Sequence, residues 1–244
     1  MIPKIIHYFW FGGNPLPPYA LKCIASWKKY LPEYEIRRWD ESNFDVNCNP
    51  YVAEAYKARK FAFVSDYARL YILYKYGGIY FDTDVELINN ISDIVARGPF
   101  FALENQIMHN VKIAPGLAMG ADPNMPFIKE ILDSYTNEHF IREDGTLNLF
   151  TINNRITNKF LALGWKPIDK VQKVRDITIY SSEFFCPYHA RTERMHLTPN
   201  SKAIHWYAGS WVDKKGWNPR KLKHIAKIMI PERILGWWLE RNIK

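Results

Sequence analysis

The stretch that decides the fold is FAFVSDYARLYILYKYGGIYFDTDVELI, residues 61–88. Its first part, residues 61–76, repeats apolar side chains at three- and four-residue steps, which predicts a helix with one apolar face. Gly77 and Gly78 provide a stop signal at the C-terminal end of that helix. The β-forming residues 79–88 then predict one continuous strand.

The rest of the chain extends this alternation in both directions. The expected strands are 4–11, 34–39, 99–104, 111–120, 176–181 and 202–207, and the expected helices are 18–30, 50–59, 124–138 and 150–163. Alternating strands and helices indicate an α/β fold, and the later strands lack regular crossover helices, so we expect a mixed central sheet flanked by helices. The length of 244 residues fits one domain, expected over 1–219, followed by a basic amphipathic helical tail over 220–244.

The acidic residues of the strand at 79–88 suggest a metal site. In one continuous strand, Tyr80, Asp82, Asp84 and Glu86 would share a face. Two bare carboxylates about 6.5–7 Å apart repel by roughly 2–3 kcal/mol at an effective dielectric constant of 20. A hard divalent cation, Mg²⁺ or Mn²⁺, would turn this repulsion into binding energy. The alternative is an edge strand with a solvated acidic face.

Residues 65–84, SDYARLYILYKYGGIYFDTD, resemble the signature of glycosyltransferase family 32, whose members carry an Asp-x-Asp motif. The stretch is also similar to the glycosylating domain of large clostridial toxins. Residues 2–12 resemble the first strand of the family, and residues 203–211, AIHWYAGSW, resemble its C-terminal motif. The resemblance implies a GT-A fold and transfer of a sugar from a nucleotide-sugar donor with retention at the anomeric carbon.

The resemblance also implies roles for individual residues. Asp82, Asp84 and Arg69 would form the catalytic group, and a Mn²⁺ or Mg²⁺ ion would be held by Asp82, Asp84 and His205. The residues expected to contact the donor are Trp10 on the base, Ser65, Asp66, Arg69, Tyr80, Asp82 and Thr83 around the sugar and phosphates, and Ser210 and Trp211 closing over the diphosphate. Physically, a divalent ion bridging carboxylate and phosphates stabilises the charge of the leaving group.

Several of these residues also have ordinary structural interpretations. Asp66 and Arg69 could form an i,i+3 ion pair worth about 0.2–0.5 kcal/mol. His205 could be a hydrogen-bonded structural histidine, and Trp10 a buried strand residue. Trp211 could serve packing alone. Glu86 and Glu104 lie near predicted strand ends, but neither can be assigned as a nucleophile.

The charge of the chain is uneven. Lys and Arg number 33 against 25 Asp and Glu, a net charge of +8, and residues 220–244 carry seven of the basic residues with only two Glu. Basic residues mixed with Trp237, Trp238 and several Ile predict a helix on an anionic membrane surface. The alternative is a helix packed on the domain. A nucleic-acid partner is not expected, because no nucleic-acid-binding motif accompanies the charge.

The N-terminus and the cysteines bear on location. The first ten residues lack a small-residue cleavage site, so we expect no signal peptide. No uncharged apolar run reaches about 18 residues, so we expect no membrane-spanning helix. Three widely spaced cysteines form neither a disulfide framework nor a zinc motif, which favours a reducing compartment. We expect a cytoplasmic protein with a peripheral position on the inner face of the membrane.

These observations predict a metal-dependent, retaining hexosyl- or N-acetylhexosaminyltransferase. The resemblance favours a UDP-sugar donor and a saccharide or lipid-linked acceptor in capsular or other surface polysaccharide synthesis. One alternative is a toxin-like effector that glycosylates a protein. A second alternative is a non-catalytic module that binds a nucleotide or a saccharide, which the intact Asp82 and Asp84 argue against.

Overall fold

The computed structural model describes residues 1–105, 111–190 and 192–209. Its strands are β1 (Ile5–Phe9), β2 (Glu35–Trp39), β3 (Gly78–Tyr80), β4 (Val85–Leu87), β5 (Phe100–Asn105), β6 (Val111–Ile113), β7 (Met119–Ala121), β8 (Gln172–Val174), β9 (Ile177–Tyr180), β10 (Tyr188–His189), β11 (Arg194–Met195) and β12 (Ala203–His205). Its helices are α1 (Pro18–Tyr30), α2 (Pro50–Lys57), α3 (Phe61–Tyr76), α4 (Ser92–Val95), α5 (Pro126–Asp133), α6 (Ile152–Ala162) and α7 (Ser182–Phe185).

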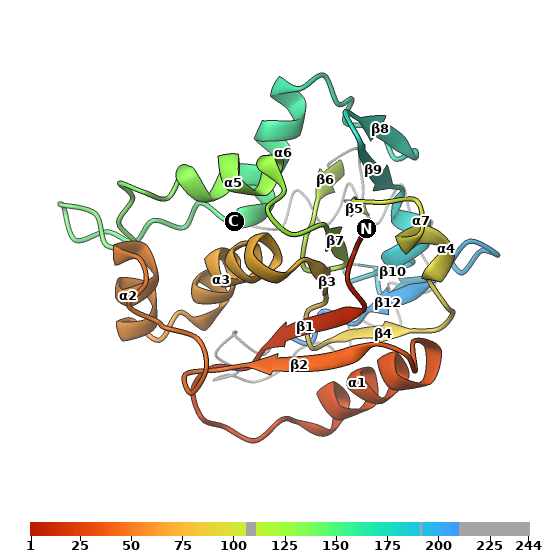
Figure 1. Ribbon diagram of the computed structural model, residues 1–244, viewed down its shortest axis with the longest axis horizontal. Helices are drawn as coiled ribbons and strands as arrows, with labels where there is room; N and C mark the ends of the chain where they lie inside the picture. The colour runs from red at the N-terminus through yellow and green to blue at the C-terminus, as the bar shows by residue number, and fades with distance from the viewer. Residues whose placement is uncertain (106–110, 191, 210–244) are drawn as a thin grey trace.

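The central sheet is mixed and flanked by helices, as the sequence predicts (Figure 1). Its strand order is β2-β1-β3-β7-β5-β9-β8, and β6 pairs with β5 beside this path. β1 pairs in parallel with both β2 and β3, whereas β7 is antiparallel to both of its neighbours. The carboxyl ends of β1, β2 and β3 therefore meet at one edge, where open α/β sheets bind ligands.

The strand expected at 79–88 is broken, which corrects the sequence prediction. β3 belongs to the central sheet, but β4 pairs antiparallel with β12 in a separate two-stranded sheet. Between them the Asp82 N–H donates to the carbonyl of Gly116 at 2.9 Å, and the Val85 N–H closes a turn onto the carbonyl of Asp82 at 3.1 Å. Tyr80, Asp82, Asp84 and Glu86 therefore do not share the face of one strand.

Two other expected elements differ from the prediction. The strand expected at 111–120 splits into β6 and β7, because a turn intervenes in which the Leu117 N–H donates to the carbonyl of Ala114 at 3.1 Å. The helix expected at 124–138 is the shorter α5 followed by turns. Periodicity alone misses the break between β6 and β7 because the buried turn keeps its apolar side chains.

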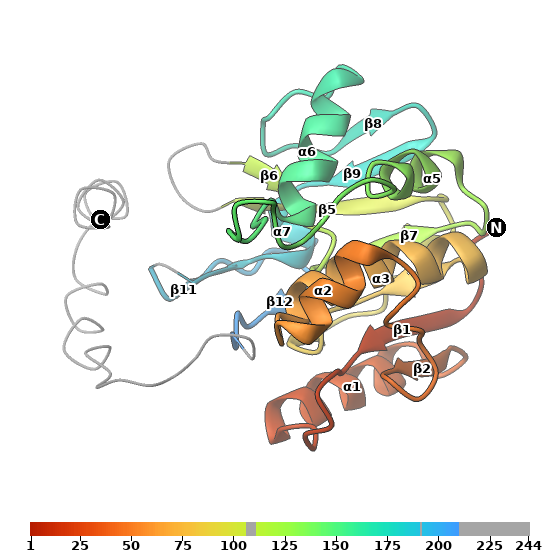
Figure 2. The same ribbon diagram turned by 90° about the vertical axis from the view of Figure 1, so that its left-hand side faces the viewer.

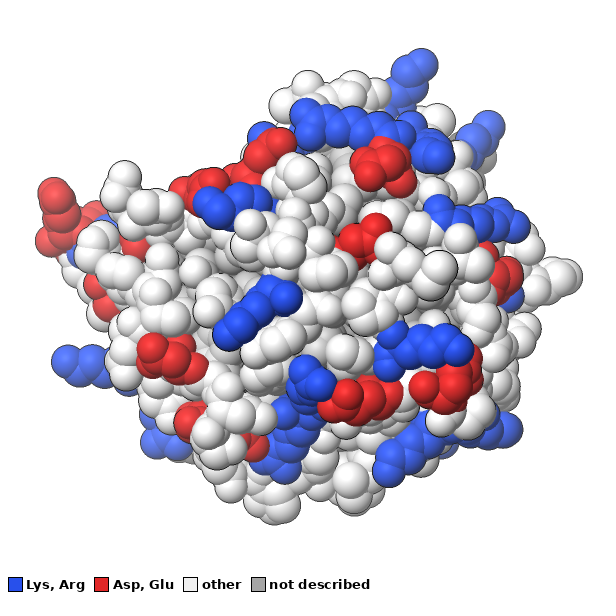
Figure 3. Space-filling model, viewed as in Figure 1, with Lys and Arg blue, Asp and Glu red and all other residues white. Residues whose placement is uncertain are grey.

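Hydrophobic cores lie on both sides of the sheet. One contains α2, α3, α5 and α6, which face the viewer in Figure 2, and the other contains α1 and α7. On the face drawn in Figure 3, basic and acidic side chains are interspersed rather than gathered into one basic field. Within the described residues, no helix has the length and apolar character needed to cross a membrane. Ser210, Trp211 and the expected tail at 220–244 lie outside the described residues.

Candidate active site

Three side chains gather where the central sheet meets the two-stranded sheet. Asp82 follows β3, Asp84 lies in the turn before β4, and His205 ends β12. One ligand atom from each of the three lies within 4.8 Å of the others. The turn that breaks the strand carries Asp84, and the pairing of β4 with β12 brings His205 to the same place.

Asp84 and His205 form a half-buried pair. His205 Nε2 lies 3.0 Å from Asp84 Oδ1, and the Ala208 N–H donates to Asp84 Oδ2 at 2.8 Å. Burial alone would raise the pKa of Asp84, but the charge and hydrogen bond of His205 hold it below its usual value. Burial would lower the pKa of His205, and Asp84 overcomes this effect and raises it. Asp84 is therefore held as a carboxylate.

The donor set fits a divalent cation. Two carboxylates and an imidazole nitrogen suit Mn²⁺, and carboxylate oxygens also suit Mg²⁺. The remaining ring nitrogen of His205, Nδ1, is buried and has no hydrogen-bond partner among the residues that the structure describes. Because metal ligation requires a neutral imidazole, a bound cation would replace the proton that Asp84 otherwise favours on His205.

Arg69 connects Asp82 to Asp66. Its Nη2 lies 3.3 Å from Asp66 Oδ1 and 3.4 Å from Asp82 Oδ1, and its guanidinium lies 4.7 Å from the centroid of the Tyr80 ring. Its Nε donates to the carbonyl of Ser65 at 3.0 Å. The i,i+3 ion pair considered from the sequence is therefore present, but it is one part of a buried chain of charges that reaches the Asp-x-Asp motif.

Tyr80 and Gly116 fix the position of Asp82. The Tyr80 hydroxyl donates to Asp82 Oδ1 at 2.6 Å. A Cβ atom built on Gly116 would overlap Asp82 Oδ2 and would lie 3.1 Å from Arg69 Nη1. Only a residue without a side chain fits here, because the backbone of residue 116 itself covers the carboxylate.

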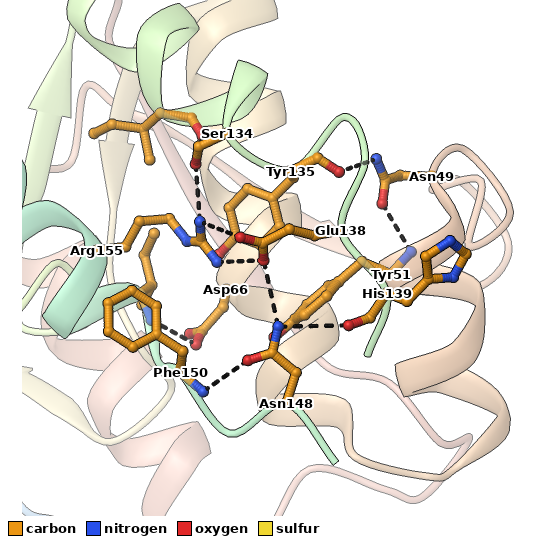
Figure 4. Close-up of polar contacts among 12 residues, drawn as sticks. Asn49, Tyr51, Asp66, Ser134, Tyr135, Glu138, His139, Asn148, Phe150 and Arg155 are labelled. Atoms are coloured by element: carbon orange, nitrogen blue, oxygen red, sulfur yellow. Dashed lines mark hydrogen bonds and ion pairs between the residues drawn. The ribbon is translucent and has the colours of Figure 1, made fainter. Parts of the chain in front are cut away.

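Asp66, a residue of α3, contacts the N-terminal end of α6. Its Oδ2 accepts the N–H of Ile152 at 3.1 Å, and burial raises its pKa to about 6 despite the nearby charge of Arg69. Figure 4 shows that a polar network adjoins this contact. In this network Arg155 donates to Glu138 at 3.0 and 2.6 Å and to Ser134 Oγ at 2.9 Å. The network secures the start of α6 against Asp66.

The structure describes three of the other predicted site residues, Trp10, Thr83 and Ser65. Trp10 is half-buried at the end of β1, where its ring N–H donates to the carbonyl of Asn14 at 2.7 Å. Thr83 is buried in the turn between the two aspartates. Ser65 reaches Arg69 through its backbone carbonyl. The predictions for Ser210 and Trp211 fall outside the described residues.

A pocket of about 560 Å³ opens at the same edge of the sheet. It is lined by residues that follow β1 and β2, by the end of α2 and the segment after it, and by the first residue of α3: Gly12, Gly13, Glu41, Tyr56, Lys57, Arg59 and Phe61. Its volume is within the range of small-molecule sites. Phe61 and Asp66 lie on one helix, about 8 Å apart along its axis. The pocket thus shares α3 with Asp66 and Arg69.

Sequence reasoning missed three contributors to the site. Gly116 carries no motif, and a glycine in a run of small residues gives no signal of what covers it. The Ala208 N–H acts through the backbone, which side-chain patterns cannot show. Glu41, two residues after the end of β2, could have been singled out by its position at a carboxyl strand end, the rule that also draws attention to Asp82.

Comparison with known proteins identifies the reaction class. A family model described as a glycosyltransferase sugar-binding region containing a DXD motif matches residues 17–101. An uncharacterized glycosyltransferase of Acanthamoeba polyphaga mimivirus is 28% identical over 200 residues, covering 77% of this chain and 74% of the relative. The chain is a glycosyltransferase. It is similar to glycosyltransferase family 32, as the residues at 65–84 predict.

Other relatives agree with this assignment. Inositol phosphoceramide mannosyltransferase 3 of Schizosaccharomyces pombe is 39% identical to the glycosyltransferase over 88 residues, 34% of this chain and 24% of the yeast protein. The solved structure of the PaToxG glycosyltransferase matches with a TM-score of 0.52 and 18% identity, over 66% of this chain and 69% of that chain. The galactosyltransferase LgtC, solved with donor and acceptor sugar analogues, matches with a TM-score of 0.50 and 12% identity. The match covers 93% of this chain and 98% of the LgtC chain. The fold is of the GT-A type.

Proposed function

We propose that this glycosyltransferase moves a sugar from a nucleotide-sugar donor to a saccharide or lipid-linked acceptor with the help of a divalent cation. The observation that carries the proposal is the group of Asp82, Asp84 and His205, whose ligand atoms lie within 4.8 Å of one another. A cation bound there would neutralise the charge that develops on the leaving diphosphate. Retention at the anomeric carbon and a role in surface polysaccharide synthesis are carried over from the family resemblance.

Different residues of the chain would bind different parts of the donor. Asp82 and Asp84 would hold the cation next to the diphosphate, and Arg69 would add a fixed positive charge beside it. Asp66, buried and held by the Ile152 N–H, would accept hydrogen bonds from hydroxyls of the donor sugar. The pocket between Gly12 and Phe61 would take the nucleoside end. The resemblance alone favours uridine there, and an anionic membrane surface facing residues 220–244 stays a prediction of the sequence.

Substitution of Asp84 by Asn tests the proposal. The variant should lose the metal-dependent part of nucleotide-sugar turnover, by about 10²–10³-fold, because one charged ligand and the partner of His205 are removed. Calorimetric titration with Mn²⁺ gives a second readout that does not depend on knowing the acceptor.

Asp93→Asn is the matched control, because Asp93 is an exposed carboxylate whose partner is Lys202 at 3.2 Å. Its turnover and Mn²⁺ affinity should equal those of the wild type. An Asp84→Asn protein that keeps metal-stimulated turnover would refute the proposed site.

A further inference from the structure

The acidic residue of the pocket, Glu41, is held in a fixed orientation. Its Oε1 accepts the N–H of Gly12 at 2.5 Å and the hydroxyl of Tyr56 at 3.1 Å. These two donors come from the segment after β1 and from α2, so the carboxylate joins both walls of the pocket. Within the described part of the chain, no hydrogen bond holds the second oxygen, Oε2. The carboxylate is thus oriented in advance and keeps one oxygen for a ligand.

A fixed carboxylate selects groups that donate hydrogen bonds, since it is an acceptor only when ionised. Guanine presents two neighbouring donors, N1–H and the exocyclic N2 amino group, beside an acceptor, O6. Uracil presents a single N–H between two carbonyl oxygens, each of which a carboxylate would repel. Among the common bases, guanine therefore offers Glu41 the best-matched edge.

The rest of the pocket suits the same edge. Lys57 and Arg59 are exposed side chains that line the pocket with Glu41, so a cation is available for an acceptor such as O6. The Gly13 side of the pocket is open, because a Cβ atom built there would meet nothing within 4 Å. A volume of about 560 Å³ accommodates a bicyclic base as well as a monocyclic one.

We infer that Glu41 reads the nucleobase of the donor and that the pocket prefers guanine over the uracil that the resemblance suggests. This inference rests on the proposed function, because it takes the pocket as the nucleoside end of a nucleotide-sugar site. Glu41 is then a specificity-determining residue, and the charged oxygen Oε2 is the atom that distinguishes the bases.

Binding of free nucleotides tests the inference without knowledge of the sugar or the acceptor. Calorimetry with Mn²⁺ present would compare GDP, UDP, ADP and CDP on the wild-type protein. We expect GDP to bind about 10- to 100-fold more tightly than UDP, because guanine donates a hydrogen bond to the charged carboxylate and uracil does so less well. Equal or tighter binding of UDP would overturn the inference.

The Glu41→Gln variant sharpens the test. Its side-chain oxygen can still accept from Gly12 and Tyr56, but the amide NH₂ then faces the base as a donor. GDP should lose most of its advantage, and UDP should bind as well as before or better. A uniform loss for all four nucleotides would show that Glu41 only supports the fold of the pocket, and would overturn the inference.

Two further variants separate the possible failures. Tyr56→Phe removes one donor to Glu41 but keeps the carboxylate. The ratio of GDP affinity to UDP affinity should therefore fall below that of the wild type but stay above that of Glu41→Gln. Asp84→Asn should weaken the binding of GDP and of UDP by the same factor, because the substitution acts at the diphosphate end of the nucleotide. If no nucleotide binds the wild type with Mn²⁺, the proposed function itself fails. If nucleotides bind but UDP binds as tightly as GDP or more tightly, only the inferred role of Glu41 is contradicted.

Discussion

At the scale of single residues, the geometry of the proposed metal site depends on what surrounds Asp82 as much as on Asp82 itself. Tyr80 donates to one of its oxygens, Arg69 pairs with the same oxygen, and Gly116 lies against the other. Its rotamer is therefore determined from three sides. Motif reading finds the aspartate, but the glycine 34 positions later becomes part of the site only because the chain folds back over it.

Substitution of Gly116 by Ala should disable the site while leaving the fold intact. The added methyl group would displace the Asp82 carboxylate, and a displacement of about 1 Å in a catalytic group costs on the order of 10²-fold in rate. Overpacking of this kind destabilises a protein by about 1–3 kcal/mol. The expected result is a folded protein whose Mn²⁺ affinity and turnover both fall.

Gly145→Ala is the control for the loss of stability alone. Gly145 has a positive φ of 79°, and a Cβ atom there would meet no atom within 4 Å. This variant should lose about 1 kcal/mol of stability through backbone strain, with Mn²⁺ affinity unchanged. If Gly116→Ala binds Mn²⁺ as the wild type does, Gly116 has no part in positioning Asp82.

At the scale of elements, the junction between α6 and α3 depends on Arg155. Its guanidinium contacts Glu138, Ser134 Oγ and the face of the Tyr135 ring at 4.0 Å, as Figure 4 shows for the first two. Because Arg155 lies one turn after Ile152, these contacts fix the amide that donates to Asp66. The position of α6 is thereby linked to Asp66, which we propose binds the donor sugar.

Replacing Arg155 by Met should cost about 2–4 kcal/mol of unfolding free energy, because Glu138 and Ser134 lose their partner. Hydrogen exchange at the Ile152 amide should also become faster. A loss of stability elsewhere in the molecule would not accelerate exchange specifically at this amide. Urea unfolding and exchange mass spectrometry measure the two effects.

The double variant Arg155→Met with Glu138→Gln provides the check. It should be less destabilised than the sum of its two single variants, because no unpaired charge remains. Strict additivity would mean that the ion pair contributes nothing to the junction.

At the scale of the whole molecule, His7 links three strands of the sheet. It is fully buried in β1, its Nδ1 accepts from Trp39 Nε1 at 3.0 Å on β2, and its Nε2 donates to the carbonyl of Gly77 at 2.9 Å before β3. Both ring nitrogens are satisfied only in the neutral form. Burial accordingly lowers the pKa of His7 to about 4.

The depressed pKa predicts a loss of stability in mild acid. The unfolded chain binds a proton at His7 below about pH 6.5, whereas the folded protein resists it down to about pH 4. The stabilisation from His7 is therefore complete above pH 6.5 and disappears as the pH falls towards 4, by on the order of 3 kcal/mol in all. At pH 5 the loss should be about 2 kcal/mol.

Urea unfolding at pH 7 and pH 5 measures this effect. His7→Gln is the matched variant, because an amide can also donate and accept but does not titrate. It should be less stable than the wild type at pH 7 and should show a difference between the two pH values that is smaller by about 2 kcal/mol. Equal differences in the two proteins would contradict a neutral, buried His7.

The sequence by itself determined the elements built from local pattern. Helix 18–30 begins at a proline and helix 61–76 ends before Gly77, as the sequence predicts, because these signals act within a few residues. It also determined the reaction class, since an ordered motif at 65–84 keeps its spacing regardless of the rest of the chain. Asp82, Asp84 and His205 were singled out in the same way.

Only the tertiary structure decided how these residues meet. The break at 81–84, the pairing of β4 with β12 and the cover of Asp82 by Gly116 depend on segments more than 30 residues apart in the chain. Glu41 also depends on tertiary contacts, because its partners Gly12 and Tyr56 lie 29 and 15 residues away and come from different parts of the fold. Local patterns cannot encode such contacts, because the free energy that selects them comes from packing and hydrogen bonds between distant segments.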